Sequence, residues 1–209
     1  MKKFVKVLLA VMLTLVMVCS FAACKKDKTV DVTINLQDGR KIELVLYPKY
    51  APKTVENFVA LAKEGYYDGL CISNMHESYF VAGDYQVDTQ GADSYTVKAT
   101  ESRPTIKGEF YNNGYIVQNE PMRHTAGVIS MMRDADSFDS ASTAFFLCGE
   151  SVTEFDRNYA AFGYTKDDAS LQVIKDILEV ETTSYEVDDE TTLTLPSEVI
   201  IIASIVVHD

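Results

Sequence analysis

Short runs of alternating or β-branched residues, separated by turn residues, are the feature that most restricts the fold of this chain. Residues 31–36 and 41–47 alternate apolar with polar side chains, and Asp38-Gly39 lies between them. An Asp-Gly pair between two such runs predicts a tight β-hairpin. Further strands are expected at residues 127–132, 145–148, 160–164 and 199–207, and the β-branched last run would close the sheet.

Two segments instead have the apolar spacing of an amphipathic helix. Pro52 suits the first turn of the first helix, and Gly65 would end it. The second helix is expected to begin near Asp167 or Asp168 as N-cap and to bury Leu171, Ile174, Ile177 and Leu178. Residues 79–129, with a long polar excursion at 87–105, indicate short strands joined by ordered loops, and the acidic stretch at 186–190 indicates a solvated loop. The whole pattern predicts a mainly β domain, a barrel with helices over its ends.

The N-terminal segment has the layout of an export signal. Basic residues precede an apolar stretch, which ends in small residues before Cys24. This ending resembles the lipobox after which bacterial signal peptidases cut, so we expect a lipoprotein signal peptide at 1–23, a lipid on Cys24 and a tether at 24–30. An uncleaved membrane anchor is the alternative, because the stretch is nearly long enough to span a bilayer. Either way, the body would lie on the extracytoplasmic face of the cell membrane.

The formal net charge of −12 argues against a nucleic-acid partner, because an acidic body repels phosphate backbones. Cys71 and Cys148 lack the spacing of a zinc site, and we interpret them as buried thiols, with a bridge between them as the alternative. The three histidines, His76, His124 and His208, do not cluster with other ligand types. We therefore expect no metal site.

Several blocks of residues spread over the body resemble the cyclophilins in their order along the chain and in their residues. They are APKTVENFVAL at residues 51–61, GYYDG at 65–69, IKGEF at 106–110, NGY at 113–115, RHTAGVISMMR at 123–133, FF at 145–146 and YAAFG at 159–163. The resemblance implies a closed eight-stranded antiparallel barrel capped by two α-helices, formed by a cyclophilin-like domain at residues 31–209. It also implies peptidyl-prolyl cis-trans isomerase activity, which requires no cofactor.

The same resemblance implies a peptide groove on the outer face of the barrel. Family members hold the proline ring in an apolar pocket and donate to the imide nitrogen from a guanidinium. The residues at matching positions that we expect to bind substrate are Tyr79, Phe80, Ala82, Met132, Ala144, Phe146, Phe155 and Tyr159.

Three polar groups of the family pattern are replaced here. The segment ISNMH at residues 72–76 stands where the family has Phe-His-Arg-Val-Ile, so Asn74 takes the place of the catalytic arginine. Two glutamines become Ala82 and Ala144, and Met132 is longer than the small residue usual there. Asn74 is either a repurposed catalytic donor or a substitution that abolishes the chemistry. Arg133 and Arg123 are the nearest spare guanidiniums. Arg133 matches an arginine common in bacterial relatives, which favours a structural or rim role over that of a substitute catalyst.

These observations predict an extracytoplasmic isomerase that assists the folding of exported proteins, with turnover weakened at Asn74. The alternative is a non-catalytic prolyl-peptide-binding module or holdase, and a weaker one is a structural envelope lipoprotein. The expected partners are proline-containing peptides or unfolded exported proteins, with the membrane reached through the lipid on Cys24. We expect a monomer.

Overall fold

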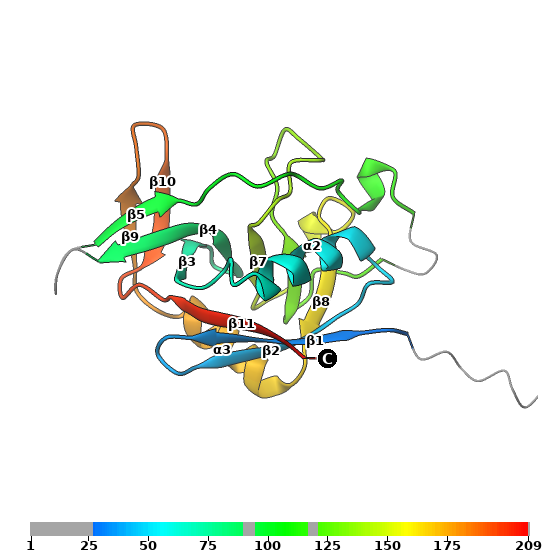
Figure 1. The fold of residues 1–209 in the computed structure, drawn as a ribbon, viewed down its shortest axis with the longest axis horizontal. Coiled ribbons are helices and arrows are strands. Elements are labelled where there is room, and N and C mark those ends of the chain that lie inside the picture. The colour runs from blue at the N-terminus through cyan, green and yellow to red at the C-terminus, as the bar shows by residue number, and fades with distance from the viewer. Residues whose placement is uncertain (1–26, 90–94, 117–120, 209) are drawn as a thin grey trace, which may run out of the picture.

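The computed structural model describes residues 27–89, 95–116 and 121–208, which form a curled antiparallel sheet with two α-helices beside it (Figure 1). The expected signal peptide at 1–23 and residues 24–26 of the expected tether therefore lie outside the described residues. The elements in chain order are β1 Val30–Leu36, β2 Lys41–Leu46, α2 Pro52–Lys63, β3 Leu70–Met75, β4 Tyr79–Thr89, β5 Tyr95–Ala99, η1 Tyr111–Asn113, β6 Val128–Met131, β7 Phe145–Cys148, η2 Thr153–Phe155, β8 Ala161–Thr165, α3 Asp168–Leu178, β9 Thr182–Glu186, β10 Thr192–Pro196 and β11 Ile202–His208.

The main sheet has the strand order β11-β1-β2-β8-β6-β7-β4-β3, and its neighbours are antiparallel. The hairpin predicted around Asp38-Gly39 is confirmed as β1 and β2, and Gly39 has the positive φ that the turn requires. Strands β6, β7 and β8 also match the predicted runs.

The two edge strands, β3 and β11, meet only where the chain enters β11. Cys71 and Ile201 form an isolated bridge, and the Ile72 N–H donates to the Ile200 carbonyl at 3.0 Å. Within the described ranges no continuous ladder joins these edges, and their contact is limited to the start of β3 and the residues around the start of β11. The predicted closed eight-stranded barrel is therefore a strongly curled half-barrel of antiparallel strands.

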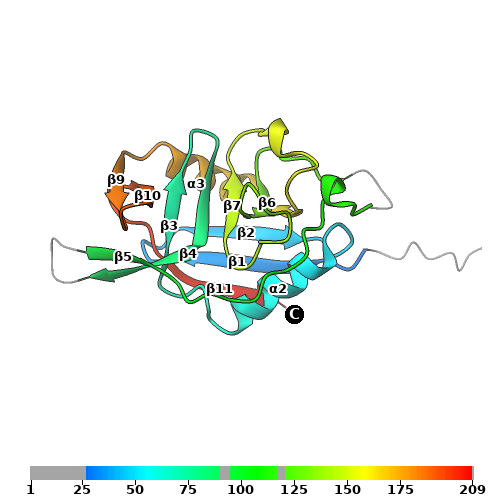
Figure 2. The same cartoon turned by 90° about the horizontal axis from the view of Figure 1, so that it is seen from above.

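The main core lies inside this curl. Alternate side chains of β1 and β2 point into it and are almost fully buried: Val32, Ile34, Leu36, Ile42, Leu44 and Leu46. Phe58 of α2 completes the core, packing against the rings of Tyr67, Phe145 and Phe162. Helix α2 lies beside β11 and α3 beside β2, on opposite sides of the strands (Figure 2).

The two helices begin in different ways. Asp167 is the N-cap of α3, and its side chain accepts from the Ser170 N–H at 2.8 Å, which decides between the two predicted caps. The N-cap of α2 is Ala51, which has no capping side chain. Glu109 takes that role from a distant segment, accepting from the Lys53 N–H at 3.0 Å and from the Thr54 N–H at 2.8 Å.

The polar segment 87–105 contains much of a hairpin, and the acidic run at 186–190 is the exposed turn of a second hairpin, in agreement with the solvated loop predicted there. Residues 87–105 include the end of β4 and all of β5, which pair with each other. The acidic run at 186–190 is the end of β9 and the turn into β10. These hairpins lie at the same end of the molecule in both views (Figures 1 and 2). A separate apolar cluster of Cys71, Val97, Leu193 and Leu195 packs there, and it explains why polar strands stay ordered.

Cys71 and Cys148 are both buried and free. They belong to different apolar clusters, so the interpretation as buried thiols is confirmed and the bridge is not formed. Burial raises the pKa of each thiol to about 12. No helix among the described residues is long and apolar enough to cross a membrane.

Candidate functional site

Four aromatic side chains gather on the outer side of the curl. Tyr79 comes from β4, Phe146 from β7, Phe155 from η2, and Tyr159 from the segment before β8. The ring centroid of Phe146 lies 5.5 Å from that of Tyr79, 5.3 Å from Phe155 and 5.5 Å from Tyr159. Phe146 is fully buried, whereas the other three are partly exposed. We call these four residues the aromatic face, with Phe146 as its floor.

The pleat of β4 decides which side chains reach this face. Tyr79 pairs with Cys148, and Val81 pairs with Phe146, so both side chains lie on the aromatic side. Phe80 and Ala82 alternate to the other side and pack in the main core, 2% and 1% exposed. The prediction that Phe80 and Ala82 line the groove is therefore corrected: they lie beneath the sheet, and Val81 takes their place.

Met132 and Ala144 lie at one edge of the aromatic face. Both are partly buried against the same apolar cluster, and the Met132 N–H donates to the Ala144 carbonyl at 2.9 Å. The two positions are thus adjacent across the β6–β7 pair. A long thioether and a methyl group therefore form this edge.

Arg133 supports the rim and is not free to act elsewhere. Its guanidinium lies 4.5 Å from the Tyr159 ring centroid, a cation–π distance. Its Nε donates to the Asn158 carbonyl at 2.9 Å, and Nη1 donates to the Asp134 carbonyl at 2.8 Å. These bonds hold the cation against Tyr159, in agreement with the predicted rim role.

A buried histidine packs against Phe146, the floor of the aromatic face. The His124 ring stacks on Phe146 with centroids 5.7 Å apart. Its Nδ1 lies 3.1 Å from Asp156 Oδ1 and its Nε2 lies 3.0 Å from Ser130 Oγ, so we assign Nδ1 as donor and Nε2 as acceptor. Burial lowers the pKa of His124, against the opposing effect of Asp156. The ring is therefore neutral at pH 7, and both of its nitrogens bond side chains.

Asn74 lies on β3, beside the irregular pairing with β4. The register shifts between Ile72 and Asn74. Asn74 Oδ1 accepts a hydrogen bond from the Thr194 backbone N–H at 3.3 Å. The carboxamide oxygen thus connects β3 to β10, a strand far away in sequence, while the Nδ2 group keeps its donor capacity. Neither β10 nor this contact could be predicted from the local sequence.

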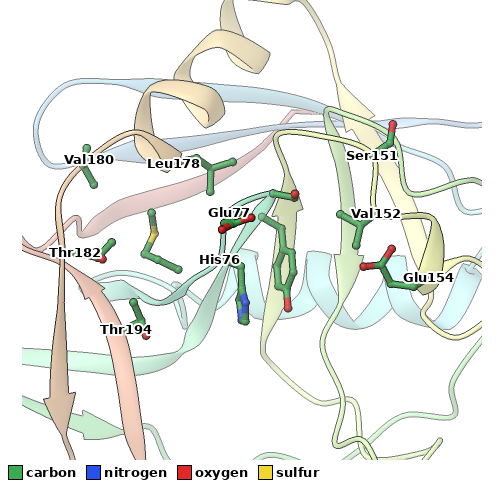
Figure 3. Close-up of a pocket in the computed structure, with 12 residues that line it drawn as sticks. His76, Glu77, Ser151, Val152, Glu154, Leu178, Val180, Thr182 and Thr194 are labelled. Atoms are coloured by element: carbon green, nitrogen blue, oxygen red, sulfur yellow. The ribbon is translucent and has the colours of Figure 1, made fainter.

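Open space lies on both sides of the aromatic face. A cavity of about 220 Å³ shares Tyr159, and residues that line it include Tyr50, Phe110, Met122 and Ala161. A larger cavity of about 660 Å³ shares Tyr79 and extends under the β9–β10 hairpin (Figure 3). His76 borders the larger cavity and stacks on Tyr79, with ring centroids 4.3 Å apart. Sequence reasoning missed His76 as a site residue, although its place three residues before Tyr79 in a short turn could have indicated it.

No group of His, Cys, Asp or Glu side chains that could hold a metal ion occurs in the part of the chain that the structure describes. The site consists of aromatic rings, one amide and two adjoining cavities. Such a surface suits the binding of an apolar or prolyl side chain.

Comparison with known proteins decides the family. The family described as "Cyclophilin type peptidyl-prolyl cis-trans isomerase/CLD" matches residues 29–203. This chain belongs to the cyclophilin-type peptidyl-prolyl cis-trans isomerases. Peptidyl-prolyl isomerisation is accordingly the activity class of this cyclophilin.

Individual relatives agree with the family. A peptidyl-prolyl cis-trans isomerase of Helicobacter pylori strain J99 is 35% identical over 152 residues, 72% of this chain and 82% of the relative. Peptidyl-prolyl cis-trans isomerase B of Bacillus subtilis is 32% identical over 129 residues, 61% of this chain and 78% of the relative. A putative bifunctional phosphatase/isomerase of Streptococcus pyogenes is 29% identical over 85% of this chain, which spans 38% of that longer protein.

Solved structures show the same fold. A Cryptosporidium parvum cyclophilin-type isomerase superposes with a TM-score of 0.61 at 20% identity, over 87% of this chain and 99% of the other. Its structure obtained in the presence of the dipeptide Ala-Pro has a TM-score of 0.59. The predicted cyclophilin fold is therefore confirmed, with the incomplete closure described above.

Proposed function

We propose that this cyclophilin is an extracytoplasmic prolyl isomerase with weakened turnover, which acts on exported proteins while they fold beside the membrane. The observation that carries the proposal is the aromatic face of Tyr79, Phe146, Phe155 and Tyr159. Asn74 pairs with Val81, which pairs with Phe146, and we assign it to the position of the family arginine. The face supplies apolar contact for a proline ring. The amide supplies only a neutral donor.

The chemistry explains why the loss of a cation weakens turnover. Rotation about a peptide bond has a barrier of about 18–20 kcal/mol, because resonance gives the C–N bond double-bond character. A donor that bonds the imide nitrogen weakens this resonance. Asn74 Nδ2 is shorter and uncharged compared with a guanidinium. We therefore expect binding of prolyl peptides to survive better than catalysis.

An isomerisation assay tests this function. The cis-to-trans conversion of a short X-Pro peptide would be followed by NMR exchange with and without the purified full chain in detergent. We expect measurable acceleration that depends on the chain concentration. Rates equal to the uncatalysed control would exclude the isomerase.

The location is part of the proposal and has its own test. A lipid on Cys24 would anchor the body outside the cytoplasm, and the residues around 24–30 would serve as tether. Labelling cells with a fatty-acid analogue should mark the wild-type chain but not Cys24→Ser. Protease that is added outside the cells and can reach the outer face of the membrane should digest the body. A chain that is unlabelled and protected would contradict this location.

A second candidate is a prolyl-peptide-binding module or holdase without turnover. The hydrogen bond between Asn74 Oδ1 and the Thr194 N–H favours it, because part of the amide is already committed to β10. Peptide-induced NMR shifts without acceleration in the same assay would support this candidate. Under either function we propose that the chain acts as a monomer on proline-containing segments.

A further inference from the structure

The larger cavity beside Tyr79 is built from four separate parts of the chain. The β3–β4 turn supplies His76 and Glu77, η2 supplies Glu154, and the β9–β10 hairpin supplies Thr182 and Thr194. Figure 3 shows these residues around one space, with Leu178 and Val180 from the end of α3 and the segment after it above them. The cavity has about 660 Å³, enough for a long side chain.

The charge in this cavity has one sign. Glu77 and Glu154 are both exposed and line it, and neither has an ion-pair partner among the described residues. His76 is the one basic side chain among the lining residues, and burial lowers its pKa, so it is neutral at pH 7. A cation that entered the cavity would thus meet carboxylates without a competing charge.

The walls suit the rest of a long cationic side chain. Met75, Val152, Leu178 and Val180 contribute apolar surface. Lysine and arginine place their methylene stems along apolar surface and keep the charged end near polar groups. The hydroxyls of Thr182 and Thr194 add acceptors at the hairpin side.

We propose that this cavity is a specificity subsite that accepts a lysine or arginine close to the proline of a bound peptide. The inference rests on the proposed function, because Tyr79 belongs both to the aromatic face and to the cavity. A proline on the face would place neighbouring residues of the peptide beside the β9–β10 hairpin. The substrate class is then basic prolyl segments.

The test compares peptides that differ only in the ammonium group. Each peptide carries one proline and either lysine or norleucine, scanned from one to three positions on each side. Affinities for the full chain in detergent are measured by isothermal titration. We expect lysine to bind about fivefold more tightly than norleucine at one or two positions, with a smaller ratio at high salt.

Variants locate the effect. In a double variant Glu77→Gln and Glu154→Gln, the ratio of lysine to norleucine affinity should fall toward one. Glu101→Gln makes the same type of charge change at an exposed residue that does not line the cavity, and it should retain the ratio. A lysine preference that persists in the double variant would overturn the subsite.

The outcomes separate this inference from the proposed function. Equal affinity of lysine and norleucine peptides at every position would overturn the subsite, while binding of the norleucine peptide would leave the prolyl site intact. If no prolyl peptide bound at all, both the proposed function and the subsite would be rejected.

Discussion

Introducing a guanidinium at position 74 is the change that most directly tests the proposed function of this cyclophilin. A charge-assisted hydrogen bond contributes about 1.5–3 kcal/mol, compared with about 0.5–1.5 kcal/mol for a neutral bond. If Asn74 donates to the imide nitrogen now, Asn74→Arg should gain about 1–1.5 kcal/mol in the transition state. That gain corresponds to a rise of about five- to twelvefold in kcat/KM, at about 1.4 kcal/mol per tenfold.

The structure also sets a cost for this substitution. The Thr194 N–H would lose its acceptor at 3.3 Å, which should lower the free energy of unfolding by about 0.5–1 kcal/mol. For a domain of this size that loss shifts Tm by about 1–4 °C. Asn74→Ala removes the same acceptor without adding a cation, so it is the matched control for stability.

The assay combines X-Pro isomerisation with thermal unfolding of the same samples. We expect Asn74→Arg to exceed the wild type in kcat/KM, and Asn74→Lys to gain less, because an ammonium lacks the planar fork of donors. An arginine variant that folds like Asn74→Ala but isomerises no faster would refute the reasoning. The limit would then lie at Ala144, Met132 or the tightly packed rings.

Three further predictions concern stability and reactivity. Glu109→Ala removes a carboxylate that caps the first turn of α2, and thermal unfolding should show that the free energy of unfolding falls by about 2–4 kcal/mol. The control Glu101→Ala should change the free energy of unfolding by less than about 0.5 kcal/mol. Burial lowers the pKa of His124, so the imidazole binds a proton more readily in the unfolded chain than in the folded one. The contribution of His124 to the free energy of unfolding should therefore be complete above pH 6.5 and decrease below it. Urea titrations of His124→Gln should show a flatter pH dependence. With pKa values of about 12, Cys71 and Cys148 should react with iodoacetamide at neutral pH only after unfolding, and rapid alkylation of the folded chain would contradict their burial.

Local periodicity was sufficient for the elements whose pattern depends on one buried face. The β1–β2 hairpin, α2 and α3 were predicted because each carries apolar residues at the spacing of its own backbone. The β4–β5 and β9–β10 hairpins were missed. Most side chains of β9 are exposed and polar, so its alternation is hidden, and its order depends on packing such as the stacking of Tyr185 on Tyr95.

The residues of the candidate site were likewise predicted only in part. Family motifs pointed to Tyr79, Phe155 and Tyr159, which the structure brings together. They also pointed to Phe80, which the pleat of β4 turns into the core. The Thr194 contact joins segments 120 residues apart and leaves no trace in local sequence.

The pairing of β1 with β11 has a consequence for how the newly synthesised chain reaches its final state. Asn35 on β1 bonds Ser204 on β11 across 169 residues, so the edge of β1 that does not pair with β2 lacks its neighbour until β11 is synthesised. Contacts of such long sequence separation slow the search for the native topology. Until then one edge of β1 remains unpaired and open to pairing with wrong partners.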